Sequence, residues 1–283
     1  VILNLQILSN SDIFSNLVQW FSFCVSIITI SLISKEFGLK KELQIISAFF
    51  ISTLPLAILH TSNTKNDLVL CSFILLFYYY QLCSLKKFSF KNIILSGIAL
   101  GLCILTKGTS YIFLFSIGIV FFIYSIRISN YDKRIKIIYK TISVVFIGFT
   151  INLPHFIRCH LKYNNLFGGN ELIEIVKNDN FSFFIIFSNL FRLIAYQLGS
   201  TINIVNWYIY RIVQVLLGNS ISDPNTTLLG MNFRPPFFSI HEDHAGNIIH
   251  TLFIILLCFI SFMFIKKVNK LQLTSLWISI LSI

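Results

Sequence analysis

Charged residues are scarce in this chain. Asp, Glu, Lys and Arg make up 12% of its 283 residues, whereas soluble domains carry about 25%. Hydrophobic residues make up 55% of the chain and the mean hydropathy is +0.79. Several long runs hold no charge at all. This composition excludes an ordinary soluble domain and is typical of polytopic membrane proteins.

Acidic residues are scarcer still, with 11 Asp and Glu against 22 Lys and Arg and a formal net charge of +11. On a soluble protein, such an excess would suggest nucleic-acid binding. Here the basic residues are scattered over short connecting segments and form no stripe, so we expect no nucleic-acid partner. Positive charge confined to short loops instead fits the preference of membrane proteins for Lys and Arg on the cytoplasmic side.

The sequence has no Cys-x-x-Cys pair, and all of its six cysteines except Cys159 stand in apolar runs. This excludes a disulfide framework or a cysteine-based zinc site and indicates small buried side chains. A starting methionine is also missing. Because the chain begins at Val1 and stops inside the apolar run 276–283, we expect a fragment of a longer protein.

Long apolar runs predict helices that cross a membrane, for which about 20 residues are needed. The predicted helices cover residues 18–34, 43–60, 68–85, 92–105, 110–126, 137–153 and 248–265, and an eighth begins near 271. Residues 154–247 form one long segment between them. In it, apolar residues recur at helical spacing: Phe184, Phe187, Phe191, Ile194 and Leu198. Ser188, Arg192 and Tyr196 fall on the opposite face, so we predict an interfacial helix here and a second over 203–217.

The loops of one set hold most of the basic residues: Lys35, Lys40 and Lys41; Lys86, Lys87 and Lys91; Arg127, Lys133, Arg134, Lys136 and Lys140; and Lys266, Lys267 and Lys270. These loops should be cytoplasmic, and the alternate loops should share the outer side. We therefore predict an all-α fold, a polytopic transmembrane helix bundle with interfacial helices in one long outer segment. The predicted domains are N-terminal transmembrane helices over 1–153, the outer segment over 154–247 and C-terminal transmembrane helices over 248–283.

A short polar link, residues 60–67, joins two charge-free runs and holds the first candidate site residues. Asp67 stands where a helix should begin, after Lys65 and Asn66. One explanation of Asp67 is an N-cap, since carboxylates accept the free amide hydrogens of a helix start. The other is a catalytic carboxylate at the lipid–water boundary, with Asn66 and Lys65 contacting substrate. At the bilayer centre such a charge would cost about 2.5–3.5 kcal/mol or more.

Lys107 and Arg158 are the candidate cations for an anionic substrate. Lys107 follows a charge-free run and precedes Gly108. It is either an interfacial lysine whose amino group reaches water or a phosphate contact, for which its compact charge is suited. Arg158 follows the sixth predicted helix at its outer end, where an arginine can pair with an anionic head group.

The densest polar cluster runs from His241 through Glu242, Asp243 and His244 to Asn247. His241, Glu242 and Asp243 could contact substrate. Imidazole and carboxylate groups could also hold Zn²⁺ or another divalent ion, with His241, Glu242 and His244 as ligands. The spacing matches no standard metal motif, and an ordinary solvated loop is the third explanation. A divalent metal ion is therefore the one cofactor that the sequence suggests.

Four stretches in order resemble recurrent stretches of bacterial membrane glycosyltransferases of the C superfold, relatives of protein O-mannosyltransferases and of the enzymes that transfer aminoarabinose to lipid A. They are residues 54–67, ending in Thr-x-Asn-Asp; 101–109, ending in Thr-Lys-Gly-Thr; 152–168, ending in Phe-Gly; and 241–250. Each motif is short. Their order over about residues 3–250, and their common predicted outer side, carry the resemblance.

The resemblance implies an enzyme that takes a sugar from a polyprenyl-phosphate donor in the membrane lipid. An acceptor hydroxyl or amine, on a glycan, a lipid or a protein, attacks the anomeric carbon with inversion. The implied principal base is a carboxylate of the first outer loop, which would lie upstream of Val1. Asp67 would match the second-loop acid, and Lys107 and Arg158 would contact the donor phosphate. The implied location is the bacterial inner (plasma) membrane, with the active face outward.

A transporter or flippase for a lipid-linked or anionic substrate is the alternative. Transporter sites usually lie near the bilayer midplane, at polar or broken helices. The centres of the predicted helices carry no Asp, Glu, Lys or Arg, and the polar residues gather at one face. That distribution favours chemistry at the membrane surface. A non-catalytic assembly protein is a third interpretation.

Overall fold

The computed structural model describes residues 2–168, 182–223, 232–239 and 246–263. Over these residues the fold is helical and contains no strand, which confirms the predicted all-α bundle. Four helices are long and apolar enough to cross a membrane: Leu17–Glu36, Asp67–Lys86, Ser110–Ile128 and Arg134–Tyr163. The protein is an integral membrane protein.

The chain divides into two units by its internal packing. The first unit comprises Val1–Thr53, His60–His155 and Ser261–Ile283, and the second comprises Leu54–Leu59 and Phe156–Ile260. The helices up to residue 163 are α1 (Ile2–Ser9), α2 (Leu17–Glu36), α3 (Lys41–Ser52), α4 (Pro55–His60), α5 (Asp67–Lys86), α6 (Phe90–Thr106), α7 (Ser110–Ile128) and α8 (Tyr131–Tyr163). Later in the chain come α10 (Phe183–Gln197), α11 (Asn203–Leu217), the 3₁₀ helix η1 (Gly218–Ser222) and α12 (Ile248–Met263).

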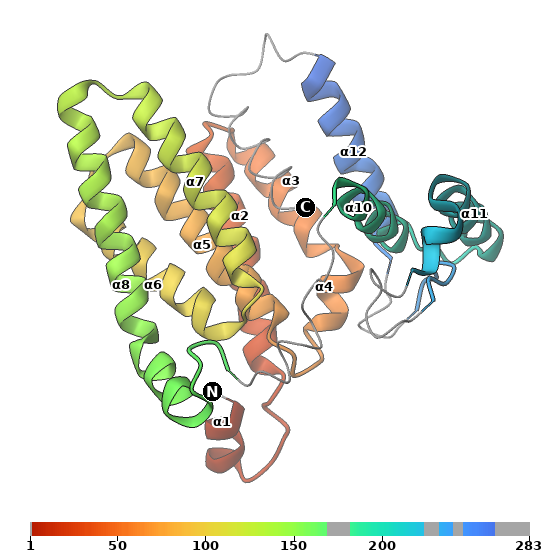
Figure 1. The fold of residues 1–283 in the computed structure, drawn as a ribbon, viewed down its shortest axis with the longest axis horizontal. Helices are drawn as coiled ribbons and strands as arrows, with labels where there is room; N and C mark the ends of the chain where they lie inside the picture. The colour runs from red at the N-terminus through yellow and green to blue at the C-terminus, as the bar shows by residue number, and fades with distance from the viewer. Residues whose placement is uncertain (1, 169–181, 224–231, 240–245, 264–283) are drawn as a thin grey trace. The chain divides into compact units, whose positions relative to one another are not determined.

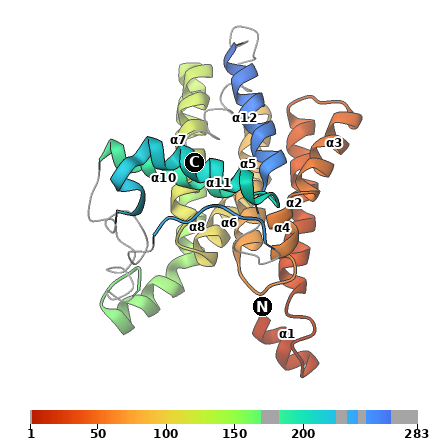
Figure 2. The same ribbon diagram turned by 90° about the vertical axis from the view of Figure 1, so that its right-hand side faces the viewer.

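Successive helices of the first unit run in alternating directions (Figure 1). The connections 61–66 and 107–109 therefore share one end, which we call the polar-loop end. The connections 37–40, 87–89 and 129–130 share the other, which we call the lysine-rich end. Helix α5 packs against α2, α6 and α7, and α3 lies beside α2 (Figure 2).

The interior of the first unit combines apolar and small polar side chains. Phe77 and Leu82 of α5 and Cys103 of α6 are almost completely buried. Ser26 and Thr29 of α2 are also buried, and each hydroxyl donates to the carbonyl four residues earlier, at 2.8 and 2.7 Å. Large apolar side chains cover much of the outside. This distribution suits a bundle in lipid, where small and internally bonded residues mediate helix contacts.

Helices α6 and α8 approach closely through glycines. A Cβ atom at Gly97 would lie 2.7 Å from the Cβ atom of Ile147, and one at Gly148 would lie 2.1 Å from Leu100 Cδ2. Gly97 and Gly101 have the spacing of small residues that allows membrane helices to pack backbone to backbone. Asn152 is fully buried beside them, and its amide donates to the carbonyl of Gly101 at 2.9 Å.

Two predicted helix boundaries are wrong, each near a proline. The helix predicted over 43–60 is broken, because α3 ends at Ser52 and α4 begins at Pro55. A proline fits the first turn of a helix, and the residue before it disfavours helical backbone. The helix predicted to end at residue 153 instead continues through Pro154 to Tyr163. Proline removes one backbone hydrogen bond there, which membrane helices tolerate.

Helix α8 also begins earlier than predicted, at Tyr131 rather than at residue 137. Lys140 was counted with the basic loop residues although the predicted helix 137–153 includes it, and it lies within α8 and is 6% exposed. The predicted boundary between residues 153 and 154 falls inside the same helix. The proposed division into 1–153, 154–247 and 248–283 stays a prediction.

The helices α10 and α11 of the second unit pack against each other. Ser188 and Arg192 are buried, while Phe183, Phe184 and Phe187 are exposed. The Arg192 guanidinium donates to the carbonyl of Ser220 at 2.7 Å. Burial lowers the pKa of Arg192, and the nearby charge of Asp223 acts in the opposite direction. Both segments are helical as predicted. Ser188 and Arg192 of α10 are buried whereas Tyr196 of the same predicted face is exposed, and the interfacial placement stays a prediction.

Candidate active site

An ion pair joins the two short connections of the polar-loop end. Asp67 is the first residue of α5, and Lys107 directly follows α6. The Lys107 amino group donates to Asp67 Oδ1 at 2.5 Å, and both side chains are about 40% exposed (39% and 38%). The two residues singled out from separate sequence motifs, 40 positions apart, are therefore direct neighbours.

The structure does not use Asp67 as an N-cap. Asn66 occupies the N-cap position of α5, and no side chain caps this helix start. The Asn66 amide instead donates to the carbonyl of Thr106 at 2.7 Å, at the end of α6. Two side-chain contacts, Asn66 with Thr106 and Asp67 with Lys107, thus hold the start of α5 against the end of α6.

A buried polar network supports the connection that precedes Asp67. Gln19 of α2 is fully buried, and its Nε2 donates to Asn63 Oδ1 at 3.3 Å. The backbone amide of Val69 donates to Gln19 Oε1 at 3.2 Å. Gln19 therefore contacts both sides of Asp67, the loop before it and the first turn of α5 after it. Buried polar side chains with satisfied hydrogen bonds fix local geometry in this way.

Asn63 also contacts His60, so the same hydrogen-bond network extends to the end of α4. Asn63 Nδ2 donates to the buried His60 Nδ1 at 2.9 Å, and its Oδ1 accepts from the backbone amide of Lys65 at 3.0 Å. Because Nδ1 accepts, the imidazole proton is assigned to Nε2. The connection between Gln19, Asn63 and His60 was not predicted from the sequence. A single glutamine in the apolar run of α2 was the available signal.

The structure does not bring the other predicted substrate-binding residues together with the ion pair. Lys65 lies in the same connection as Asp67, half-buried. Arg158 is exposed on α8 and belongs to the second unit, so the structure does not relate it to the ion pair. His241, Glu242, Asp243 and His244 lie outside the described residues, and so do the predicted metal ligands among them. Within the described ranges, no group of three metal-ligating side chains is present.

Asn247, at the end of the histidine cluster, joins three segments of the second unit. Its amide donates to Gln197 Oε1 at 2.6 Å, and its Oδ1 accepts from the backbone of Leu56 at 3.2 Å. Its own carbonyl accepts from Thr251 in the first turn of α12. Gly246 beside it contacts Gly199 so closely that a Cβ atom would clash with that backbone. Asn247 therefore has a clear structural role in ordering this unit.

The ion pair provides complementary chemistry at an accessible position. An ammonium group has three donors, and the Asp67 carboxylate has acceptor capacity beyond one lysine hydrogen bond. Lys107 can thus contact an anionic oxygen while Asp67 accepts from a hydroxyl group. Opposite charges next to each other are suited to a substrate with a phosphate beside a sugar.

One family model matches the chain over residues 2–157, more than half of its length, and is described as dolichyl-phosphate-mannose-protein mannosyltransferase. The matched range includes Asp67 and Lys107 and ends just before Arg158. Comparison with curated proteins finds no match, and neither does comparison with solved structures. By this match, the chain belongs to the dolichyl-phosphate-mannose-protein mannosyltransferase family, a family of membrane glycosyltransferases.

Proposed function

We propose that this protein transfers a sugar from a polyprenyl-phosphate donor to an acceptor at the outer face of the membrane. The Asp67–Lys107 ion pair carries the proposal, because it joins two family-like motifs at the polar-loop end. Family membership supports the lipid-linked donor. The concentration of lysines at the opposite end supports an outward polar-loop end, with the bacterial inner membrane as the proposed location.

Each residue of the pair has a distinct proposed role. Lys107 contacts the donor phosphate, for which a compact ammonium charge is suited. Asp67 then accepts hydrogen bonds from sugar or acceptor hydroxyls and orients them. Charge develops on the leaving phosphate in the transition state, and a cation fixed nearby stabilises it. Asn66, Lys65, Arg158, His241, Glu242 and Asp243 remain proposed substrate contacts.

In the proposed reaction, the bond between the anomeric carbon and the phosphate oxygen breaks. The acceptor oxygen or nitrogen forms the new bond to that carbon, and polyprenyl phosphate leaves with the electron pair. The acceptor proton passes to a general base, which the resemblance implies to be a carboxylate of another outer loop.

The test uses the full-length protein, reconstituted with a radiolabelled polyprenyl-phosphate sugar and a membrane extract as acceptor source. Asp67→Asn and Lys107→Ala should each lower transfer about 100-fold, because each removes a charge from the reacting site. Glu36→Gln is the matched control, since Glu36 pairs with Lys86 at 2.9 Å at the lysine-rich end. Normal transfer by both site variants, with folding intact, would exclude this site.

A further inference from the structure

Two neighbouring cavities lie at the lysine-rich end of the first unit. One, of about 260 Å³, lies between the end of α5, the end of α7 and the first turns of α8, and its polar lining includes Lys86, Ser129, Lys136 and Lys140. The other, of about 290 Å³, continues between α7 and α8 and has a mainly apolar lining. Lys140 lines both cavities, together with Ser125 and Ile137. A polar chamber thus opens beside an apolar one.

Lys140 is the unusual residue of this region. It is 6% exposed, and among the residues that the structure describes no hydrogen bond or ion pair to its amino group is found. The amino group is also not among the described polar atoms that are fully enclosed and unpaired, so it borders the open space of the cavity. An ammonium group on a largely buried side chain with no anionic neighbour is costly, and the cost rises in a membrane. An anionic group in the adjoining cavity would supply the missing partner.

The other basic side chains make the polar cavity positive. Lys136 lies one helical turn before Lys140 and is exposed at the rim. Lys86 also lines the cavity, but its amino group contacts the Glu36 carboxylate at 2.9 Å and the Glu36 carbonyl at 2.6 Å. Two lysines therefore remain for a ligand, and the hydroxyl of Ser129 offers a further donor.

The apolar cavity has the character of a site for a hydrocarbon chain. Phe115 and Val145, on α7 and α8, line it and are largely exposed on the bundle surface. Gly118 also lines this cavity, and a Cβ atom there would meet no neighbouring atom. A chain could therefore enter from the surrounding lipid. Lysines that can bind a phosphate thus lie beside a cavity that can hold an acyl chain, and a phospholipid has both of these parts.

We propose that these cavities bind one anionic phospholipid, with its phosphate at Lys140 and Lys136 and an acyl chain between α7 and α8. Basic pockets between membrane helices on the cytoplasmic side bind acidic head groups by the same physics. The ligand would come from the leaflet opposite the proposed transfer site. The lipid would connect α5, α7 and α8 at the lysine-rich end, independently of the sugar-transfer proposal.

The experiment measures lipid binding to the purified full-length protein in neutral detergent by native mass spectrometry and by thermal unfolding. Phosphatidylglycerol should bind and raise the melting temperature, whereas phosphatidylcholine and inorganic phosphate at equal concentration should not. Lys140→Met should weaken phosphatidylglycerol binding about tenfold or more, and Lys140→Arg should retain it. Lys136→Gln should weaken it roughly fivefold.

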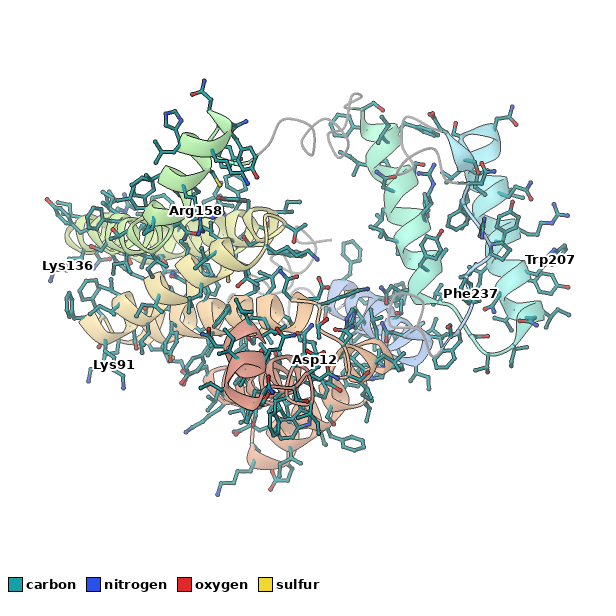
Figure 3. All side chains as sticks on the ribbon, turned by 90° about the horizontal axis from the view of Figure 1, so that it is seen from below. Asp12, Lys91, Lys136, Arg158, Trp207 and Phe237 are labelled. Atoms are coloured by element: carbon teal, nitrogen blue, oxygen red, sulfur yellow. The ribbon has the colours of Figure 1, made fainter. Side chains whose placement is uncertain are left out.

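Lys91→Gln is the matched control. Lys91 is exposed at the same end and lines neither cavity, and in Figure 3 it lies on the same edge as Lys136. Equal phosphatidylglycerol binding by the wild type and the Lys140→Met protein would overturn the proposal. Stabilisation by inorganic phosphate as strong as that by phosphatidylglycerol would overturn the lipid assignment. Should Lys140→Met fail to fold, Lys136→Gln against Lys91→Gln decides, and equal binding by these two would overturn it.

Discussion

The two ends of the first unit each hold an ion pair between helices, and the surroundings of the two pairs differ. Glu36 and Lys86 join the ends of α2 and α5, with the lysine 53% exposed. Asp67 and Lys107 join the start of α5 to the end of α6, beside the Gln19–Asn63 network. An exposed ion pair contributes little stability by itself. The network fixes the connection that precedes Asp67, as its proposed role in transfer would require.

Exchanging the charges within each pair should show the largest contrast. The double variant Asp67→Lys with Lys107→Asp keeps an ion pair but reverses its orientation toward substrate, so transfer should fall about 100-fold. The corresponding exchange of Glu36 and Lys86 should leave transfer within about twofold. Sugar transfer by reconstituted protein measures both. Restored activity in the first exchange would show that the pair has only a structural role.

Labelling should separate the two ends by membrane side. In a cysteine-free variant, a cysteine at Ser62 should react with an impermeant thiol reagent from outside at least about tenfold faster than one at Ser89. Ser62 lies in the polar-loop connection, and Ser89 precedes α6 at the lysine-rich end. Labelling in permeabilised cells controls for accessibility. Equal labelling in intact cells would contradict the proposed orientation.

Removal of Gln19 should test the network itself. Gln19→Leu should lower kcat roughly tenfold, because a shift of the connection displaces Asp67 from the reacting atoms. The matched control is Gln81→Leu: Gln81 is also buried, and its Nε2 donates to Ser96 Oγ at 2.8 Å between α5 and α6. That variant should lose stability but keep its kcat. Equal losses of kcat in the two variants would mean that Gln19 acts only through folding.

The smallest expected difference between the two ion pairs is in their contribution to the free energy of unfolding. Asp67→Asn and Glu36→Gln should each change the free energy of unfolding by less than about 1 kcal/mol, since both pairs are partly exposed. Urea unfolding in detergent, followed by tryptophan fluorescence, measures this. A much larger loss for Asp67→Asn alone would attribute its effect on transfer to unfolding.

Hydropathy and charge predicted the helical class and the common end of Asp67 and Lys107. That prediction succeeded because each apolar run reverses the chain direction, so alternate connections must share an end. The position of residues 60–67 between two apolar runs was therefore enough to predict at which end of the bundle Asp67 lies. The ion pair between Asp67 and Lys107 was not predicted, because it depends on the start of α5 lying against the end of α6.

The missed features depend on contacts between segments distant in sequence. Gln19 and Asn63 are 44 positions apart, and nothing local to either residue specifies their hydrogen bond. The apolar run of α8 starts after its charged residues, whereas the helix begins before them at Tyr131, so its start was predicted too late and Lys140 was counted with the preceding loop. For α10 the periodicity was correct, but the same two-sided pattern fits a helix facing water and a helix facing lipid.

The inward guanidinium and outward phenylalanines of α10 have a practical consequence for anyone purifying the protein. In a purified sample we expect detergent to cover the exposed phenylalanines of α10, in place of membrane hydrocarbon. Stripping the detergent away should cause precipitation while the helix content still looks normal by circular dichroism. Detergent or lipid should therefore be present at every step of the purification and the assays.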